Sequence, residues 1–281
     1  SNSIAAAMNT SFGIAPSVTG IVLAVLTGAV ILGGIKRISA VANWLVPFMA
    51  VGYIIAALVV LIVHATDVPA AFATIVTNAF TPTAAVGGFA GAAMMAGIRY
   101  GVARGIFSNE AGLGTAGIAQ AAGMSSSPVR SGLIGMMGTF FDTIVVCSMT
   151  GLAIVVSGAW TTGKTGAELT QVAFQSAMPV IGDEVVAVAL AIFALTTILG
   201  WSYYGERCWQ FLAGSWTIMP YRVLWTIAAF LGAVTHLDLA WTIADTLNAL
   251  MAVPNLVALL LLSPVVVRLT RDQLAAALGK D

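Results

Sequence analysis

Apolar positions along the chain fall in runs long enough to cross the roughly 30 Å of hydrocarbon in a lipid bilayer. Short polar segments separate these runs, which lie at residues 17–35, 41–63, 86–122, 131–157, 185–205, 218–235 and 240–267. The pattern predicts an all-α polytopic membrane protein, with residues 1–281 as a single transmembrane domain. Pro254 is predicted to divide the last run into a shorter helix and the span proper.

Two longer connections, 64–85 and 158–184, contain short semi-polar pieces. Each piece is predicted to form a helix on the surface. A short lead-in at 1–14 precedes the first run.

Composition agrees with a membrane protein and narrows its function. Charged residues make up 8% of the chain and hydrophobic residues 59%, whereas soluble domains carry about 25% charge. No basic stripe is present, which excludes a nucleic-acid partner. The two histidines lie at span edges, and neither cysteine suggests a disulfide or a metal site. A nucleophile and base at membrane depth are therefore missing, so no enzyme and no cofactor is expected.

Basic residues divide unequally between the two sets of connections. One side carries a single lysine, Lys164, and the other carries Lys36, Arg37, Arg130, Arg207, Arg222, Arg268, Arg271 and Lys280. Cytoplasmic loops are the ones enriched in lysine and arginine. We therefore expect the 36–40 connection and the C-terminus to be cytoplasmic.

The stretch "RGIFSNEAGLGTAG", Arg104 to Gly117, is polar and glycine-rich inside the third apolar run. Ser108 and Asn109 compete for backbone hydrogen bonds, and Gly112 weakens a helix. The stretch predicts a helix break at mid-depth, with Ser108 as the cap of a new helix. A broken helix presents an amino end that attracts a carboxylate and a carbonyl end that attracts a cation. This arrangement is typical of a secondary transporter that holds a zwitterion with its driving ion. The alternative is a packing kink without a ligand.

A second polar stripe lies in the fifth run. Thr197, Trp201 and Gly205 are four residues apart and share one helix face, with Thr196 beside them. A hydroxyl, a ring and a glycine on one face indicate the wall of a small pocket. Threonine hydroxyls can also bind Na⁺, a hard cation that prefers oxygen ligands. The alternative is an interfacial aromatic belt.

Ionisable residues inside the predicted spans are costly and need partners. Arg104 is predicted to pair with Asp142 or Glu110, and ion pairing is favoured over ion binding for Asp142. For Asp245, the prediction is a polar contact between helices.

Four segments carry a resemblance to a known family. They are "VLTGAVILGGIKRISAVANWLVPFMAVGY", "NAFTPTAAVGGFAGA", "GIRYGVARGIFSNEAGLGTAGIAQAAG" and "TTILGWSYYGER". The chain resembles the sodium:alanine/glycine symporters over nearly its whole length. The resemblance implies a leucine-transporter-like inverted-repeat bundle in a plasma membrane. It also implies that the N-terminal helices of the same protein, with half of the substrate site, are missing here.

By this resemblance, the expected function is sodium-coupled symport of alanine, glycine or both by alternating access. The substrate-binding residues would be Ser108, Asn109, Gly112, Thr197 and Trp201. Thr196 would be a possible ligand of the sodium ion, which serves as the coupling ion. Gly205 stands where the family often has a larger residue. The remaining alternatives are a proton-coupled or other-substrate transporter of the same fold and a channel-like membrane subunit.

Overall fold

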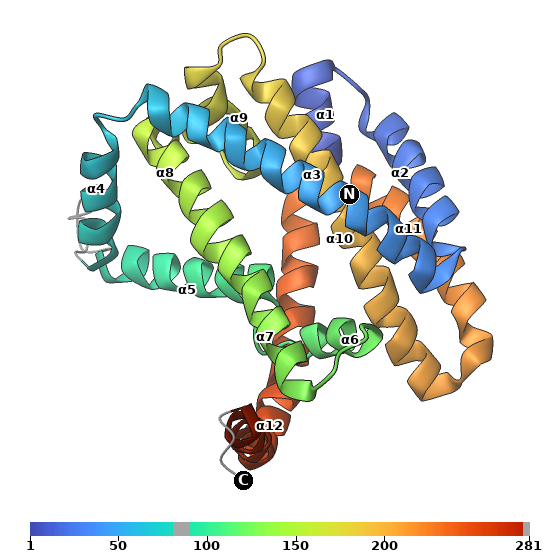
Figure 1. Ribbon diagram of the computed structural model, residues 1–281. Helices are drawn as coiled ribbons and strands as arrows, with labels where there is room; N and C mark the ends of the chain where they lie inside the picture. Colours follow the sequence, from blue (N-terminus) through green and yellow to red (C-terminus); the bar gives the residue numbers. More distant parts are fainter. Residues whose placement is uncertain (81–89, 278–281) are drawn as a thin grey trace. The chain divides into compact units, whose positions relative to one another are not determined.

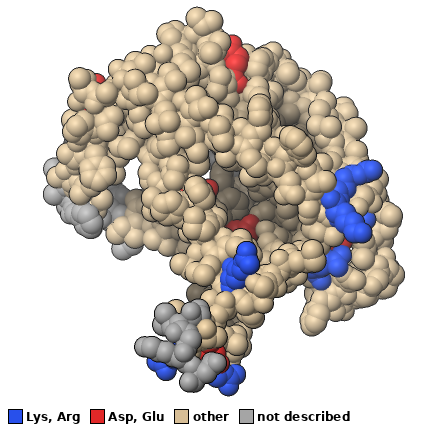
Figure 2. Space-filling model, viewed as in Figure 1, with Lys and Arg blue, Asp and Glu red and all other residues tan. Residues whose placement is uncertain are grey.

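The computed structural model describes residues 1–80 and 90–277, and this part of the chain is helical without strands. Its charged side chains are sparse over the face drawn in Figure 2. Five helical segments of the described chain are long and apolar enough to span a bilayer: Gly34–Val63, Pro128–Val156, Gly182–Ala213, Ser215–Val234 and Leu239–Ala276. The prediction of an all-α polytopic membrane protein is confirmed.

Several helix boundaries differ from the predicted ones. The first run forms α2 (Pro16–Ile31), and α3 (Gly34–Val63) begins seven residues before the predicted start at 41. The fifth run extends to α10 (Gly182–Ala213), so Glu206 and Arg207 lie within a helix rather than in a loop. Hydrophobicity locates a span, but it does not detect a helix that continues past the apolar stretch.

The prediction that Pro254 divides the last run is wrong. The helix α12 (Leu237–Ala277) is continuous, with both Pro254 and Pro264 in its interior. A helix crossing lipid tolerates proline because other groups satisfy the freed carbonyl, while ending the helix would expose more backbone.

The semi-polar connections do form helices. They are α4 (Val68–Phe80) and α9 (Gly166–Ala177). In α9 the side chains of Gln171, Ala173 and Phe174 are buried, so this helix packs into the protein. The lead-in forms α1 (Asn2–Phe12). Residues 81–89 lie outside the described residues. They include part of the segment "NAFTPTAAVGGFAGA" and the start of the predicted third run.

The chain forms two compact units, each made from two stretches of sequence. The first unit comprises Ser1–Thr81 and Ser148–Ala240, and it also contains α8 (Ser148–Val156) and α11 (Ile218–Val234). The second comprises Pro82–Cys147 and Trp241–Asp281. Its helices are α5 (Ala90–Asn109), α6 (Thr115–Ala122), α7 (Pro128–Thr139), the π-helix η1 (Phe140–Cys147) and most of α12.

In the first unit, α2 runs beside α11 at close range (Figure 1). A Cβ atom at Gly20 would lie 3.0 Å from the Phe230 ring and 3.1 Å from the Ala233 Cβ. At Gly28 it would lie 3.3 Å from the Thr226 methyl group. Small residues at such an interface let two backbones approach, which increases van der Waals contact where lipid supplies no hydrophobic drive.

A buried charge cluster joins α10 to α11. Glu206, 5% exposed, accepts hydrogen bonds from Arg222 Nε at 2.6 Å and from Arg207 Nη2 at 2.5 Å. Arg222 also donates to the carbonyl of Leu32 at 3.2 Å. The Glu206 charge is therefore compensated by two arginines, and Arg222 joins α10, α11 and the residue after α2. The Arg207 Nε is buried without a hydrogen-bond partner among the described residues.

We predict that Gly182→Ala destabilises the protein by about 1–3 kcal/mol, the range typical of overpacking. A Cβ at Gly182 would lie 2.6 Å from the backbone carbonyl of Phe174, which cannot rotate away. Gly200→Ala in the same helix is the matched control, because a Cβ there meets nothing within 4 Å. The melting temperature in detergent should fall for the first variant only. An equal melting temperature for both variants would contradict close packing of α9 on α10.

Candidate functional site

The predicted helix break is present in the second unit. The helix α5 ends at Asn109 and α6 begins at Thr115. Between them, Glu110, Gly112 and Gly114 have positive φ angles of 53°, 78° and 87°. Glycine adopts such angles without a steric penalty, whereas Glu110 holds one at a cost. The two glycines thus allow the helix to be interrupted within an apolar run, where helical hydrogen bonds are otherwise continuous.

The predicted role of Ser108 as a helix cap is wrong. Ser108 lies in the last turn of α5, and the N-cap of α6 is Gly114, with no side chain capping it. The chain turns through the left-handed residues Gly112 and Gly114 before the next helix begins. The amino end of α6 is therefore Thr115, six residues after Asn109.

The amino end of α6 holds a polar group that the sequence patterns did not single out. Thr115 is the first residue of α6 and only 5% exposed. Its hydroxyl has no hydrogen-bond partner among the described residues. The first N–H groups of a helix have no partner within it, so together with this unpartnered hydroxyl they favour the approach of an anionic group. A threonine directly after "GLG" was the available signal.

The carbonyl end of α5 meets the π-helix η1. The Ser108 hydroxyl donates a hydrogen bond to the Asp142 carboxylate, and the Thr143 hydroxyl donates to the Asn109 side-chain oxygen at 2.6 Å. The Cys147 sulfur lies 3.9 Å from the Ser108 hydroxyl. π-Helical turns are rare and occur often at functional sites. The two elements therefore bring four oxygen-bearing side chains to the end of α5.

The predicted ion pair of Arg104 with Asp142 or Glu110 is not the pair that forms. Arg104 pairs with Asp245 of α12, and its guanidinium group lies 4.0 Å from the centre of the Trp241 ring. The polar contact predicted for Asp245 is confirmed. The partner lies 141 residues away in sequence, so spacing alone could not identify it.

Thr196, Thr197 and Trp201 belong to α10, in the first unit. Both threonine hydroxyls donate to the Phe193 carbonyl, Thr196 at 2.8 Å and Thr197 at 2.9 Å. Trp201 contacts Tyr204, with ring centres 5.8 Å apart. These hydroxyls keep lone pairs that can accept a hydrogen bond or bind a cation.

Gly205 serves packing rather than a pocket. A Cβ there would lie 2.0 Å from the Tyr221 hydroxyl oxygen of α11. The side chain of Tyr221 fills the space that a larger residue would need.

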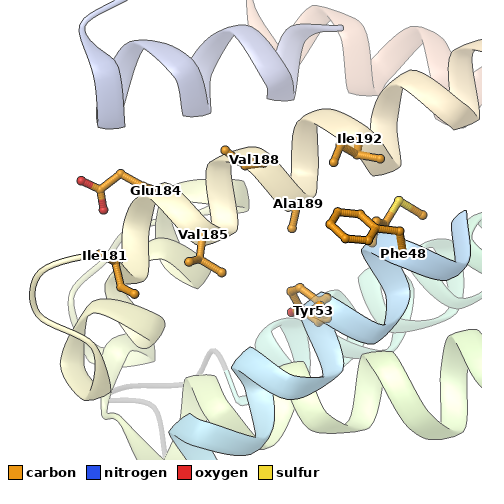
Figure 3. Close-up of a pocket in the computed structure, with 10 residues that line it drawn as sticks. Phe48, Tyr53, Ile181, Glu184, Val185, Val188, Ala189 and Ile192 are labelled. Carbon is orange, nitrogen blue, oxygen red and sulfur yellow. The ribbon is translucent and has the colours of Figure 1, made fainter. Parts of the chain in front are cut away.

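A separate groove of about 440 Å³ lies between α3 and α10 (Figure 3). Its lining is almost wholly apolar, with Phe48, Val185 and Ile192 among the side chains that form it. The Tyr53 hydroxyl bonds to Thr150 at 2.5 Å, and the Glu184 carboxylate points away from Phe48 and Tyr53 (Figure 3). The groove lacks the paired polar groups that a zwitterion needs.

Comparison with known proteins gives a consistent match. Residues 1–278 match the sequence model of the sodium:alanine symporter family. The chain is 49% identical to the sodium/alanine symporter AgcS of Methanococcus maripaludis, over 96% of this chain and 59% of that protein. It is 48% identical to an uncharacterised transporter of Haemophilus influenzae, over 96% of this chain and 60% of that protein.

A third relative, from Bacillus subtilis, is the putative sodium/proton-dependent alanine carrier protein YrbD. It is 37% identical, over 94% of this chain and 57% of that protein. The chain therefore spans somewhat under two thirds of the length of the curated relatives it matches.

We predict that Gly114→Ala strains the break by about 1–2 kcal/mol, the cost of a left-handed conformation for an L-residue. The new Cβ would also lie 3.0 Å from the Asn255 side-chain oxygen. Hydrogen–deuterium exchange over residues 110–117 should become faster. Gly117→Ala is the control, because no atom lies within 4 Å of its Cβ position, and it should leave exchange unchanged. Equal exchange in both variants would show that the turn does not depend on Gly114.

Proposed function

Because the chain belongs to the sodium:alanine symporter family, we propose that the full-length protein carrying it couples uptake of a small neutral amino acid to entry of a cation. Alanine is the proposed substrate, with glycine as a smaller one, and Na⁺ is the proposed coupling ion. The family consists of transporters, so the protein is not an enzyme. The protein is a multi-pass membrane protein, and we place it in the plasma membrane with a cytoplasmic C-terminus.

The break between Asn109 and Thr115 is the observation that carries this proposal. The amino end of α6 offers N–H groups and the Thr115 hydroxyl, which suit the carboxylate of an amino acid. A helix end interacts with an opposite charge by about 0.3–1 kcal/mol at an exposed site and by more when partly buried. Backbone groups at Ser108 to Gly112 would take part in holding the substrate.

Residues of α10 are proposed to limit the size of the amino-acid substrate. Thr197 and Trp201 would line the side-chain pocket, and the indole ring would exclude substrates with extra methylene groups. An apolar pocket separates ligands that differ by one methylene by about 1–3 kcal/mol. Thr196 is a candidate ligand of Na⁺ on the same helix, since its hydroxyl oxygen retains a lone pair.

The central test is uptake of radiolabelled alanine into proteoliposomes containing the full-length protein. We expect uptake to saturate and to require an inward Na⁺ gradient. Vesicles with equal Na⁺ on both sides, and vesicles driven by a proton gradient alone, are the controls. Uptake driven equally well by protons would identify the proton-coupled alternative. Flux that rises linearly with alanine concentration would support the channel-like alternative.

We predict that Thr115→Val raises the KM for alanine about tenfold, since a hydrogen bond to a charged group contributes about 1.5–3 kcal/mol. Valine keeps the shape of threonine and removes the hydroxyl. Thr115→Ser keeps the hydroxyl and should retain a KM close to that of the parent protein. Initial uptake rates over a range of alanine concentrations measure both. Equal KM values for the valine and serine variants would remove Thr115 from the carboxylate site.

A further inference from the structure

We propose that Asp142 is the carboxylate ligand of the coupling cation, at a Na⁺ site that also uses oxygens of Ser108, Asn109 and Thr143. This inference rests on the proposed function, because it assumes that a cation drives transport. It assigns the coupling cation to the carbonyl end of α5 in place of Thr196, whereas the substrate carboxylate is assigned to the amino end of α6.

The Asp142 carboxylate has no cationic partner among the described residues. Asp142 lies within the apolar segment Pro128–Val156. An ionised carboxylate at membrane depth costs a few kcal/mol, so it needs compensation. Asp245 of the same unit receives that compensation from Arg104. The hydrogen bond from Ser108 stabilises the Asp142 charge but does not neutralise it.

The side chains beside Asp142 offer oxygen atoms that suit a hard cation. The Asn109 amide nitrogen donates to the Gly105 carbonyl at 3.0 Å, which directs the amide oxygen toward η1. There it accepts from the Thr143 hydroxyl at 2.6 Å. Carboxylate, amide and hydroxyl oxygens are hard ligands that suit Na⁺ rather than a transition metal. The hydroxyl of Ser108 can rotate its hydrogen away from Asp142 and offer a lone pair instead.

The backbone at the end of α5 also favours a cation. Because α5 ends at Asn109, its last carbonyl groups lose their partners in the helix, apart from the Phe107 carbonyl, which accepts from the Glu110 N–H at 3.4 Å. They carry the negative end of the helix dipole, roughly half an elementary charge. This partial charge and the Asp142 carboxylate have the same sign, so their proximity is unfavourable until a cation lies between them. Side-chain charge and backbone dipole therefore select the same kind of ligand.

The test measures Na⁺ binding by the full-length protein in detergent without alanine, as the increase in melting temperature with Na⁺ concentration at constant ionic strength. Asp142→Asn, which keeps the side-chain shape, should raise the half-saturating Na⁺ concentration about tenfold or more, because ligand charge sets the affinity of such sites. Asp245→Asn is the matched control. It removes a paired carboxylate from the same unit and should lower stability while leaving the Na⁺ half-saturation unchanged.

The outcomes separate this inference from the proposed function. An unchanged Na⁺ half-saturation in Asp142→Asn overturns the site, and so does a loss confined to Thr196→Val. If alanine uptake by Asp142→Asn no longer depends on pH while its Na⁺ half-saturation is unchanged, Asp142 is a proton site. That result would also overturn the proposed Na⁺ site. Parent protein that binds Na⁺ but transports no alanine would count against the proposed function and leave the cation site standing.

Discussion

A polypeptide in hydrocarbon must satisfy its own backbone hydrogen bonds, and this constraint governs the second unit. Between Asn109 and Thr115 the chain gives up helical bonding inside an apolar run. Each peptide group left without a partner there costs several kcal/mol unless another polar group replaces it. Two turn hydrogen bonds meet part of that demand, from the Glu110 N–H to the Phe107 carbonyl at 3.4 Å and from the Leu113 N–H to the Glu110 carbonyl at 3.2 Å. Side chains of η1 bond to those of Ser108 and Asn109 where α5 ends.

The neighbouring helices divide the task of supporting the break. Asn255 and Leu256 of α12 lie against Gly114 and Gly112. A Cβ at Gly114 would lie 3.0 Å from the Asn255 side-chain oxygen, whereas a Cβ at Gly112 would make an ordinary contact of 3.4 Å with Leu256. One turn below the break, Arg104 is neutralised by Asp245 and covered by the Trp241 ring. These contacts join α5 to α12. From η1, Asp142 and Thr143 bond to the last two residues of α5 without neutralising the Asp142 charge.

The sequence was sufficient for features with a local cause. Five of the seven predicted apolar runs contain a helix long enough to span a bilayer among the described residues. Gly112 and Gly114 located the break, because glycine adopts left-handed backbone angles without a steric penalty. Features that depend on tertiary contact could not be read in this way. The pairing of Arg104 with Asp245, the packing of Gly205 on Tyr221 and the π-helical turn at Asp142 all depend on which helices become neighbours. Ser108 was wrongly predicted to cap a new helix, because serine is found both at the start of helices and in their last turn.

The charge balance of the proposed site gives a physical reason for coupling. A zwitterion adds no net charge, so it cannot offset the Asp142 carboxylate, whereas Na⁺ can. Closing a site around an uncompensated carboxylate removes water from it and costs several kcal/mol. Substrate without the cation would therefore leave the unfavourable charge in place, and occlusion would favour the state with both bound. When neither is bound, the Ser108 hydroxyl would stabilise the carboxylate by its hydrogen bond, which would lower the cost of the proposed return step without cargo. The same serine would then release Asp142 to the cation, so that one hydroxyl serves both halves of the transport cycle.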